Sequence, residues 1–392
     1  GRMKTVPFHV PYWGKEEEQS VIKTLRSGWI TKGPVTDRFE KDFAARIGTP
    51  HAVGLNSCTA GLHLALTALG LRSGDEVITS PLTFASTANV IEHSGGKTVF
   101  ADIDPHTGNI SSEEIAKRIT PRTKAVIVVH FAGRPADMDS IRRVCTSRRI
   151  PVVEDAAHAF GATYKGKKAG TLGKAASFSF YATKNITTGE GGMLTTRDSR
   201  LAKKIRKLSL HGLSLDAWKR YRPGSRTYYA VEYAGFKYNM FDIQAAIGLE
   251  QLKKSDRFQK RRTRLWERYN RMLKNRDMIC PPEKYTDGVH AKHLYIIRLK
   301  DERASKHRDA VMECMARKGI YTQIHFLSLH THPYYRKKYG YKRTDFPHAN
   351  AFSNTCISLP LYPQLTNADV DRVSEILIQC VQTVKRKRKK LR

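Results

Sequence analysis

The sequence predicts an α/β protein of two domains: a large domain built on a mostly parallel sheet with helices on both faces, and a smaller α+β domain after it. Short apolar strand candidates alternate with helical stretches through the first half of the chain, which is typical of a parallel sheet buried on both sides. The length of 392 residues exceeds one ordinary domain. After residue 200 the pattern becomes helical and basic, and a proline pair at 281–282 precedes the last part of the chain.

The elements of the large domain follow from apolar periodicity and from their stop signals. An amphipathic helix over residues 15–27 is stopped by Gly28, and a second helix covers residues 36–47. The predicted strands lie at 51–55, 76–79, 98–102, 125–130, 151–154, 176–180 and 192–195, and helices between several of them lie at 86–93, 112–119 and 138–148. Because ligands of such sheets gather at the carboxyl ends of the strands, polar motifs at these ends are the candidate site residues.

The second half of the chain predicts long helices and then a small α+β unit. The predicted helices lie at 242–254, 256–274, 304–318 and 367–384, and the predicted strands at 293–299 and 321–326. We therefore divide the chain into a large domain at 1–255 with an N-terminal segment at 1–35, a small domain at 256–384 and a basic tail at 385–392.

The composition is strongly basic. The chain carries 69 Lys and Arg residues against 36 Asp and Glu residues, a net charge of +33 that concentrates at 203–207, 253–264 and 385–392. A positive surface attracts polyanions such as nucleic acid, anionic membrane or a diphosphate-bearing substrate. A solvated basic surface explains the same composition, and the basic runs lack interleaved aromatics and a recognised nucleic-acid module. Nucleic-acid binding therefore stays as an alternative function.

The cysteines and the apolar runs indicate the cellular setting. No run of 18 apolar residues predicts a membrane span, and the N-terminus shows no apolar segment of the signal-peptide kind. The six cysteines are scattered without a C-x-x-C pair. This pattern predicts reduced thiols in a cytoplasmic protein, with neither a disulfide framework nor a zinc site.

Lys184 is the most informative lysine of the chain. It follows a predicted strand that contains Phe178 and Phe180, and small polar residues and three glycines follow it, through Gly192. A lysine at the mouth of a buried strand has the setting of a Schiff-base lysine, because burial lowers the pKa of the amine and makes the neutral nucleophile available. A plain surface lysine is the alternative interpretation.

A second motif follows the predicted strand at 51–55. There Asn56–Gly61 places small residues at the start of a helix. A helix N-terminus presents free N–H groups and the positive end of its dipole, so this segment predicts a phosphate cradle to which the Ser57 and Thr59 hydroxyls add donors. An ordinary helix cap uses the same residue types.

An acid follows the predicted strand at 151–154. Asp155 lies there among small residues, and His158 comes three residues later. A buried carboxylate at this place can keep a pyridinium nitrogen protonated. The alternative interpretation for Asp155 is a helix N-cap, and for His158 simple packing.

Together with an aromatic at Phe84, these motifs supply four elements in chain order: a phosphate cradle, a flat ring, an acid and an amine. Pyridoxal 5′-phosphate requires all four, since its phosphate, ring, nitrogen and aldehyde each need one of them. The sequence therefore predicts this cofactor.

The chain also resembles a known family, the DegT/DnrJ/StrS-type nucleotide-sugar aminotransferases, which are fold-type I pyridoxal-phosphate enzymes. The motifs that carry the resemblance are Gly28–Pro34, Ser57–Leu62, Pro81–Phe84, Glu154–His158, Ser179–Asn185, Gly235–Met240 and Leu359–Pro363. Within the family the chain is similar to members that aminate a UDP-4-keto-pentose to 4-amino-4-deoxy-L-arabinose for lipid A modification, a step linked to lipopolysaccharide biosynthesis. The segments that favour these members are Leu210–Leu213, Ile324–Phe326, His330 and Tyr334–Arg336.

The resemblance implies a role for each site residue. Lys184 binds the cofactor covalently and moves the proton, Asp155 pairs with the pyridine nitrogen, and Phe84 and His158 lie at the ring. The phosphate is held by Thr59, Ala60 and Ser179, with Asn239 from the neighbouring subunit, which implies a homodimer. Trp29, Ile30 and His325 line the sugar-nucleotide pocket.

The implied reaction is transamination, with L-glutamate as amino donor and a UDP- or dTDP-linked keto sugar as acceptor. The alternatives are another UDP-, dTDP- or GDP-keto sugar aminated at C3 or C4, or, from other classes, the nucleic-acid-binding protein named above or a pyridoxal-phosphate-dependent transcriptional regulator. The lysine at 184 argues against the family's dehydratase branch, in which a histidine replaces it.

Overall fold

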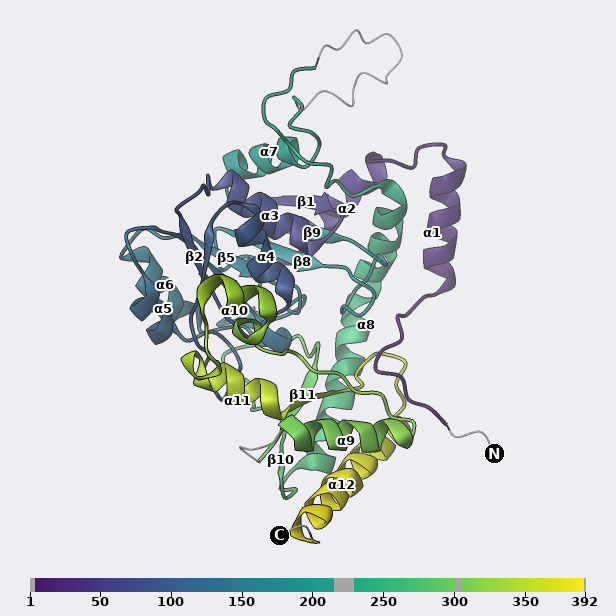
Figure 1. Ribbon diagram of the computed structural model, residues 1–392. Helices are drawn as coiled ribbons and strands as arrows, with labels where there is room; N and C mark the ends of the chain where they lie inside the picture. The colour runs from purple at the N-terminus through teal and green to yellow at the C-terminus, as the bar shows by residue number, and fades with distance from the viewer. Residues whose placement is uncertain (1–3, 215–228, 301–304, 391–392) are drawn as a thin grey trace.

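The computed structural model describes residues 4–214, 229–300 and 305–390. Within these residues, seven strands form the main sheet in the order β1-β9-β8-β5-β4-β2-β3 (Figure 1). Their bounds are β1 His51–Leu55, β9 Gly192–Thr196, β8 Ala175–Ser179, β5 Val152–Asp155, β4 Thr123–Val129, β2 Glu76–Thr79 and β3 Lys97–Phe100. The run from β8 to β3 is parallel, while β9 pairs antiparallel with both β1 and β8. The predicted α/β class with a mostly parallel sheet is confirmed.

Helices cover both faces of this sheet. On one face, α3 (Cys58–Ala68), α4 (Ala85–His93) and α7 (Ser199–Leu208) pack on apolar strand residues. On the other face lie α2 (Pro34–Ile47), α5 (Ser112–Arg118), α6 (Met138–Thr146) and the first part of α8 (Asp242–Leu273), while α1 (Lys15–Arg26) packs against α8. A 3₁₀ turn at Phe131–Gly133 and a short hairpin of β6 (Thr163–Tyr164) and β7 (Lys167–Lys168) complete the domain. Burial on both faces explains why the strands read as continuous apolar runs.

The small domain has its own core at the lower end of the molecule in Figure 1. It contains a three-stranded antiparallel sheet in the order β10-β11-β12. Its elements are β10 Ile279–Cys280, β11 Tyr295–Leu299, α9 Ser305–Arg317, α10 Pro333–Tyr339, α11 Pro347–Thr355, β12 Cys356–Leu359 and α12 Asn367–Lys390, with 3₁₀ turns at Leu329–Thr331 and Arg343–Asp345.

Three element predictions were wrong. The helices expected at 242–254 and 256–274 are one continuous helix, α8, whose two halves pack in the cores of the two domains. The strand expected at 321–326 is not formed; only Gln323 pairs with Ser358. The closing helix does not end at residue 384 but extends to Lys390, so most of the basic tail is helical. Neither α10 nor α11 was predicted.

The prediction that the chain has no disulfide was also wrong. Cys314 of α9 and Cys380 of α12 form a disulfide with their Cα atoms 5.8 Å apart. The two cysteines are separated by 66 residues, and only the packing of α9 on α12 brings them together. The other four cysteines are free.

The helix α8 connects the two domains and appears as a long helix crossing the molecule in Figure 1. Ala245, Leu249 and Phe258 pack in the core of the large domain, whereas Leu265 and Tyr269 pack in that of the small domain. The proposed boundary at 255/256 lies in this helix. None of the helices in the described residues is long and apolar enough to cross a membrane.

Candidate active site

A cavity of about 620 Å³ lies at the carboxyl ends of the parallel strands and is closed on one side by the small domain. Its lining includes six of the predicted site residues: Thr59, Phe84, Asp155, His158, Ser179 and Lys184. The seventh, His325, enters from the small domain, together with its neighbours Gln323, Ile324 and Phe326. The volume is within the range of about 300–1,000 Å³ common for small-molecule sites.

Lys184 lies in the loop that follows β8. The loop bonds to itself, since the Lys184 N–H donates to the Tyr181 carbonyl at 2.9 Å and the Thr187 hydroxyl donates to the Phe180 carbonyl at 2.9 Å. Burial lowers the pKa of Lys184 from 10.5 to about 8, although the nearby Cys58 and Asp155 act to raise it. The neutral amine is therefore populated at mildly alkaline pH, as a nucleophilic lysine requires.

Asp155 is the last residue of β5 and is buried at the cavity. Its carboxylate accepts hydrogen bonds from the Thr87 hydroxyl at 2.7 Å and from the Ala157 N–H at 3.2 Å. Burial raises the pKa of this carboxyl, and both hydrogen bonds lower it. Asp155 also caps the turn that follows, so the active-site and the capping interpretations of this residue describe the same geometry.

The phosphate-cradle motif forms the start of α3. Ser57 is the N-cap, and its hydroxyl oxygen accepts the Ala60 N–H at 3.0 Å. The first N–H groups of a helix have no intrahelical partner, so the N–H groups of Cys58 and Thr59 are the candidate phosphate donors, while that of Ala60 is already used within the cap. A Cβ on Gly192 would lie 2.3 Å from the Ser57 carbonyl carbon, which is why β9 needs glycine beside this helix end.

Two aromatic side chains and two histidines surround the space above Asp155. The Phe84 and Phe326 rings have centroids 6.1 Å apart, and Phe84 is 62% exposed, toward the cavity. The His158 ring stacks on Phe326 at 5.9 Å and lies 4.5 Å from the His293 ring. Burial lowers the pKa of both histidines well below 6.5, so both rings are neutral.

The hydrogen bonds assign the ring protons of the two histidines. His158 Nδ1 accepts the Ala132 N–H at 3.3 Å, so its proton is on Nε2. The Asn185 amide donates to the Ala291 carbonyl, and its oxygen faces His293 Nδ1 at 3.0 Å, so His293 carries its proton on Nδ1. His325 is likewise neutral, because burial lowers its pKa to about 3.

His293 and Phe326 were not predicted as site residues. Both come from the small domain, and only the docking of that domain brings them to the strand ends. The motif Ile324–Phe326 was the sequence signal that could have identified Phe326 as a site residue. His293 is the first residue of a predicted strand, and nothing in the sequence distinguishes it from an ordinary strand residue.

Besides Ala60, which is absent from the cavity lining and whose N–H is used within the α3 cap, three predicted site residues lie outside this cavity. The Trp29 indole N–H donates to the Lys32 carbonyl at 3.1 Å, and Ile30 is 45% exposed. The Asn239 side chain donates to the Met240 carbonyl at 3.0 Å and accepts from Lys237 at 2.7 Å. The three residues lie around the start of α8, since the Asp242 N–H donates to the Ile30 carbonyl at 3.2 Å.

The donor set fits pyridoxal 5′-phosphate. A lysine with a lowered pKa, a buried acid, a helix N-terminus beside hydroxyls and a wall of aromatic rings converge on one cavity. The fold and the site together define a fold-type I enzyme that depends on this cofactor.

Comparison with known proteins gives the family. Residues 11–378 match the sequence profile of the DegT/DnrJ/EryC1/StrS aminotransferase family. The chain is 50% identical over 378 residues to the spore coat polysaccharide biosynthesis protein SpsC of Bacillus subtilis, covering 96% of this chain and 97% of SpsC. The chain therefore belongs to the DegT/DnrJ/EryC1/StrS family and is a pyridoxal-phosphate-dependent sugar aminotransferase.

Solved structures agree with this assignment. Spr1654 of Streptococcus pneumoniae in its PLP form superposes with a TM-score of 0.91 at 33% identity, covering 97% of this chain and 100% of that protein. DesI, solved in the presence of its TDP-sugar product, superposes with a TM-score of 0.88 at 31% identity, covering 99% of this chain and 96% of that protein.

Proposed function

We propose that the protein transfers the amino group of L-glutamate to the ketone of a nucleotide-linked sugar, which yields an amino sugar and 2-oxoglutarate. The observation that carries the proposal is the convergence of Lys184, with its lowered pKa, and the buried Asp155 on one cavity at neighbouring strand ends. The family supports the reaction class.

Each residue has a task in this reaction. When bound, pyridoxal 5′-phosphate supplies an aldehyde that carries the amino group and a ring that takes up the electron pair of the broken C–H bond. Asp155 would hold the ring nitrogen in its protonated form, and Phe84 would cover one ring face. The Lys184 amine would take a proton from the donor carbon and return one to the acceptor carbon in the second half of the reaction.

The phosphate would be held by Thr59 and Ser179 and by the free N–H groups of Cys58 and Thr59, with Ala60 in the same first turn of α3 but with its N–H bound to Ser57. Asn239 would reach the phosphate from a second subunit. Trp29 and Ile30 lie outside the cavity of their own chain, so we propose that they line the sugar-nucleotide pocket of the partner in a homodimer. His325 would line the pocket of its own chain.

The candidate acceptor is a UDP-4-keto-pentose, on the motifs Leu210–Leu213 and Ile324–Phe326. The alternative is another UDP-, dTDP- or GDP-keto sugar aminated at C3 or C4. The name of SpsC points to a polysaccharide pathway and the DesI structure to a TDP-sugar. The cytoplasm remains the proposed location.

A spectroscopic experiment tests the reaction. Purified holoenzyme should show a visible absorption band of the lysine-bound cofactor, lose it on addition of glutamate, and regain it with a keto-sugar nucleotide from a panel of UDP- and dTDP-linked sugars. Lys184→Ala should show neither band nor turnover. Turnover by this variant, or a holoenzyme in which borohydride fixes no pyridoxyl group on Lys184, would contradict the proposal.

A further inference from the structure

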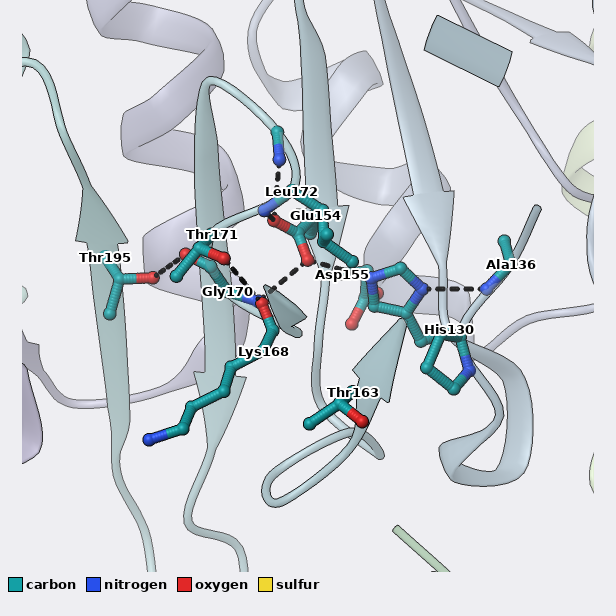
Figure 2. A network of polar contacts seen from close by, with 12 residues as sticks. His130, Ala136, Glu154, Asp155, Thr163, Lys168, Gly170, Thr171, Leu172 and Thr195 are labelled. Atoms are coloured by element: carbon teal, nitrogen blue, oxygen red, sulfur yellow. Dashed lines mark hydrogen bonds and ion pairs between the residues drawn. The ribbon is translucent and has the colours of Figure 1, made fainter. Parts of the chain in front are cut away.

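Two consecutive carboxylates end β5, and they serve opposite faces of the sheet. Side chains alternate along a strand, so Asp155 faces the cavity and α4, where Thr87 binds it, while Glu154 faces the other layer. Figure 2 shows Glu154 between His130 and the loop that contains Gly170, Thr171 and Leu172. Glu154 is fully buried and does not line the cavity.

The Glu154 carboxylate is saturated with donors. Oε1 accepts the N–H groups of Leu172 and Gly173, each at 2.7 Å. Oε2 accepts the Gly170 N–H at 2.8 Å and contacts His130 Nε2 at 2.9 Å. Donors on both oxygens make the position of this carboxylate nearly unique.

His130 is the partner that connects this carboxylate to the cavity. Its ring is fully buried, and its Nδ1 accepts the Ala136 N–H at 3.2 Å, so the ring proton is on Nε2 and points to Glu154 (Figure 2). Its main-chain N–H donates to the Asp155 carbonyl at 3.2 Å.

The turn that begins at His130 also reaches a second cavity residue. The Ala132 N–H, two residues later, donates to His158 Nδ1 at 3.3 Å. The same turn is thus tied to Glu154 on the far side of the sheet and to the two residues, Asp155 and His158, that face the proposed cofactor ring.

We propose that Glu154 and His130 form a positioning pair that fixes the end of β5 and so aims the Asp155 carboxylate at the cofactor nitrogen. The inference rests on the role of Asp155 in the proposed function. It assigns a role in cofactor binding to two side chains that do not touch the cofactor.

The geometry makes Glu154→Gln a sharp test. Every partner of the carboxylate is a donor, so the amide NH₂ of glutamine opposes an N–H in either orientation. Moving the His130 ring proton from Nε2 to Nδ1 does not remove the conflict, because Nδ1–H would then oppose the Ala136 N–H. In either orientation the amide NH₂ faces two buried N–H donors, and the strand end must shift to relieve them.

The experiment compares Glu154→Gln, Asp155→Asn and a control, Glu76→Gln. Glu76 is 3% exposed in the same domain, where it binds Thr120 and Arg122 at the start of β2, away from the cavity. The readouts are the dissociation constant of pyridoxal 5′-phosphate from titration of the apoprotein, the absorption maximum of the holoenzyme, and the melting temperature of the apoprotein. A merely structural role would change only the last of these.

We expect Glu154→Gln to weaken cofactor binding by ~10-fold or more and to move the absorption maximum in the same direction as Asp155→Asn. The control should lower the melting temperature alone. His130→Gln leaves three backbone donors on Glu154, so it should move the absorption maximum in the same direction by a smaller amount. This variant is used in place of Glu154→Gln if Glu154→Gln does not fold.

Wild-type affinity and an unchanged absorption maximum in Glu154→Gln, beside an altered Asp155→Asn, would overturn the positioning role alone. An unaltered Asp155→Asn would instead remove the role of Asp155 in the proposed function, and this inference with it.

Discussion

At the scale of single residues, burial decides the charge state of the cavity. Burial lowers the pKa of Lys184 to about 8 and that of His325 to about 3, and it holds His158 and His293 neutral. Without burial, a lysine would be cationic up to a pH near 10.5. Burial therefore supplies the neutral amine, against the opposing effects of the nearby Cys58 and Asp155.

The lowered pKa of Lys184 predicts the pH dependence of cofactor loading. Only the neutral amine attacks the aldehyde, so the rate at which apoprotein and pyridoxal 5′-phosphate form the visible band should rise with pH through about 8 and level off above it. Stopped-flow absorbance at a series of pH values measures this rate, with Lys184→Ala as the blank. A midpoint near the ordinary lysine value of 10.5 would contradict the burial argument.

At the scale of elements, α8 links the two domains through one buried guanidinium. Arg262 is 1% exposed and donates to the carbonyl of Leu361 at 3.0 Å and to those of Lys292 and His293 at 3.3 Å. Burial lowers its pKa to about 10. These bonds fix the segment that carries the His293 ring into the cavity, so the small domain contributes to the site through α8.

This arrangement explains which parts of the site the sequence predicts. The carboxyl ends of β1, β5 and β8 lie at one edge of the sheet, and Thr59, Asp155 and Lys184 lie at or shortly after these ends, so local motifs suffice. His293 depends on the docking of a second domain, which local periodicity does not encode. The same reason hid the continuity of α8 past Ser255, since local propensity gives no sign of the tertiary packing on both halves of this helix.

The disulfide between α9 and α12 makes a prediction at this scale. A cross-link between residues 66 apart is expected to stabilise the small domain by about 4 kcal/mol in the chain-entropy description. Reductant should therefore lower its melting temperature, measured by circular dichroism, and should not affect a Cys314→Ala/Cys380→Ala variant.

Thiol counting gives an independent check. Denatured protein should titrate four thiols before reduction and six after it, since six cysteines are present and four are free. Six thiols before reduction would contradict the disulfide.

At the scale of the whole molecule, the proposed function divides the site between two chains of a proposed homodimer. Trp29 and Ile30 come from one motif and Asn239 from another far along the chain, yet the three gather around the start of α8, outside their own cavity. Phe241, beside them, is 40% exposed. A surface that combines exposed apolar side chains with site residues fits a two-fold interface, in which each chain presents this edge to the cavity of the other.

Mixing two inactive variants tests this sharing of the site. Lys184→Ala removes the nucleophile, and Asn239→Asp places a negative charge against the cofactor phosphate, so each homodimer should be inactive or nearly so. If Asn239 serves the partner's cavity, a mixed dimer contains one site with both changes and one site with neither. Random exchange after mild denaturation and refolding at equal concentrations should then restore roughly a quarter of wild-type activity.

If Asn239 serves its own chain, each site of the mixed dimer carries one change and activity stays absent. Native mass spectrometry should show a peak at the mass of the mixed dimer. If that peak is present and activity is absent, Asn239 belongs to the site of its own subunit and the argument for a shared cavity is removed.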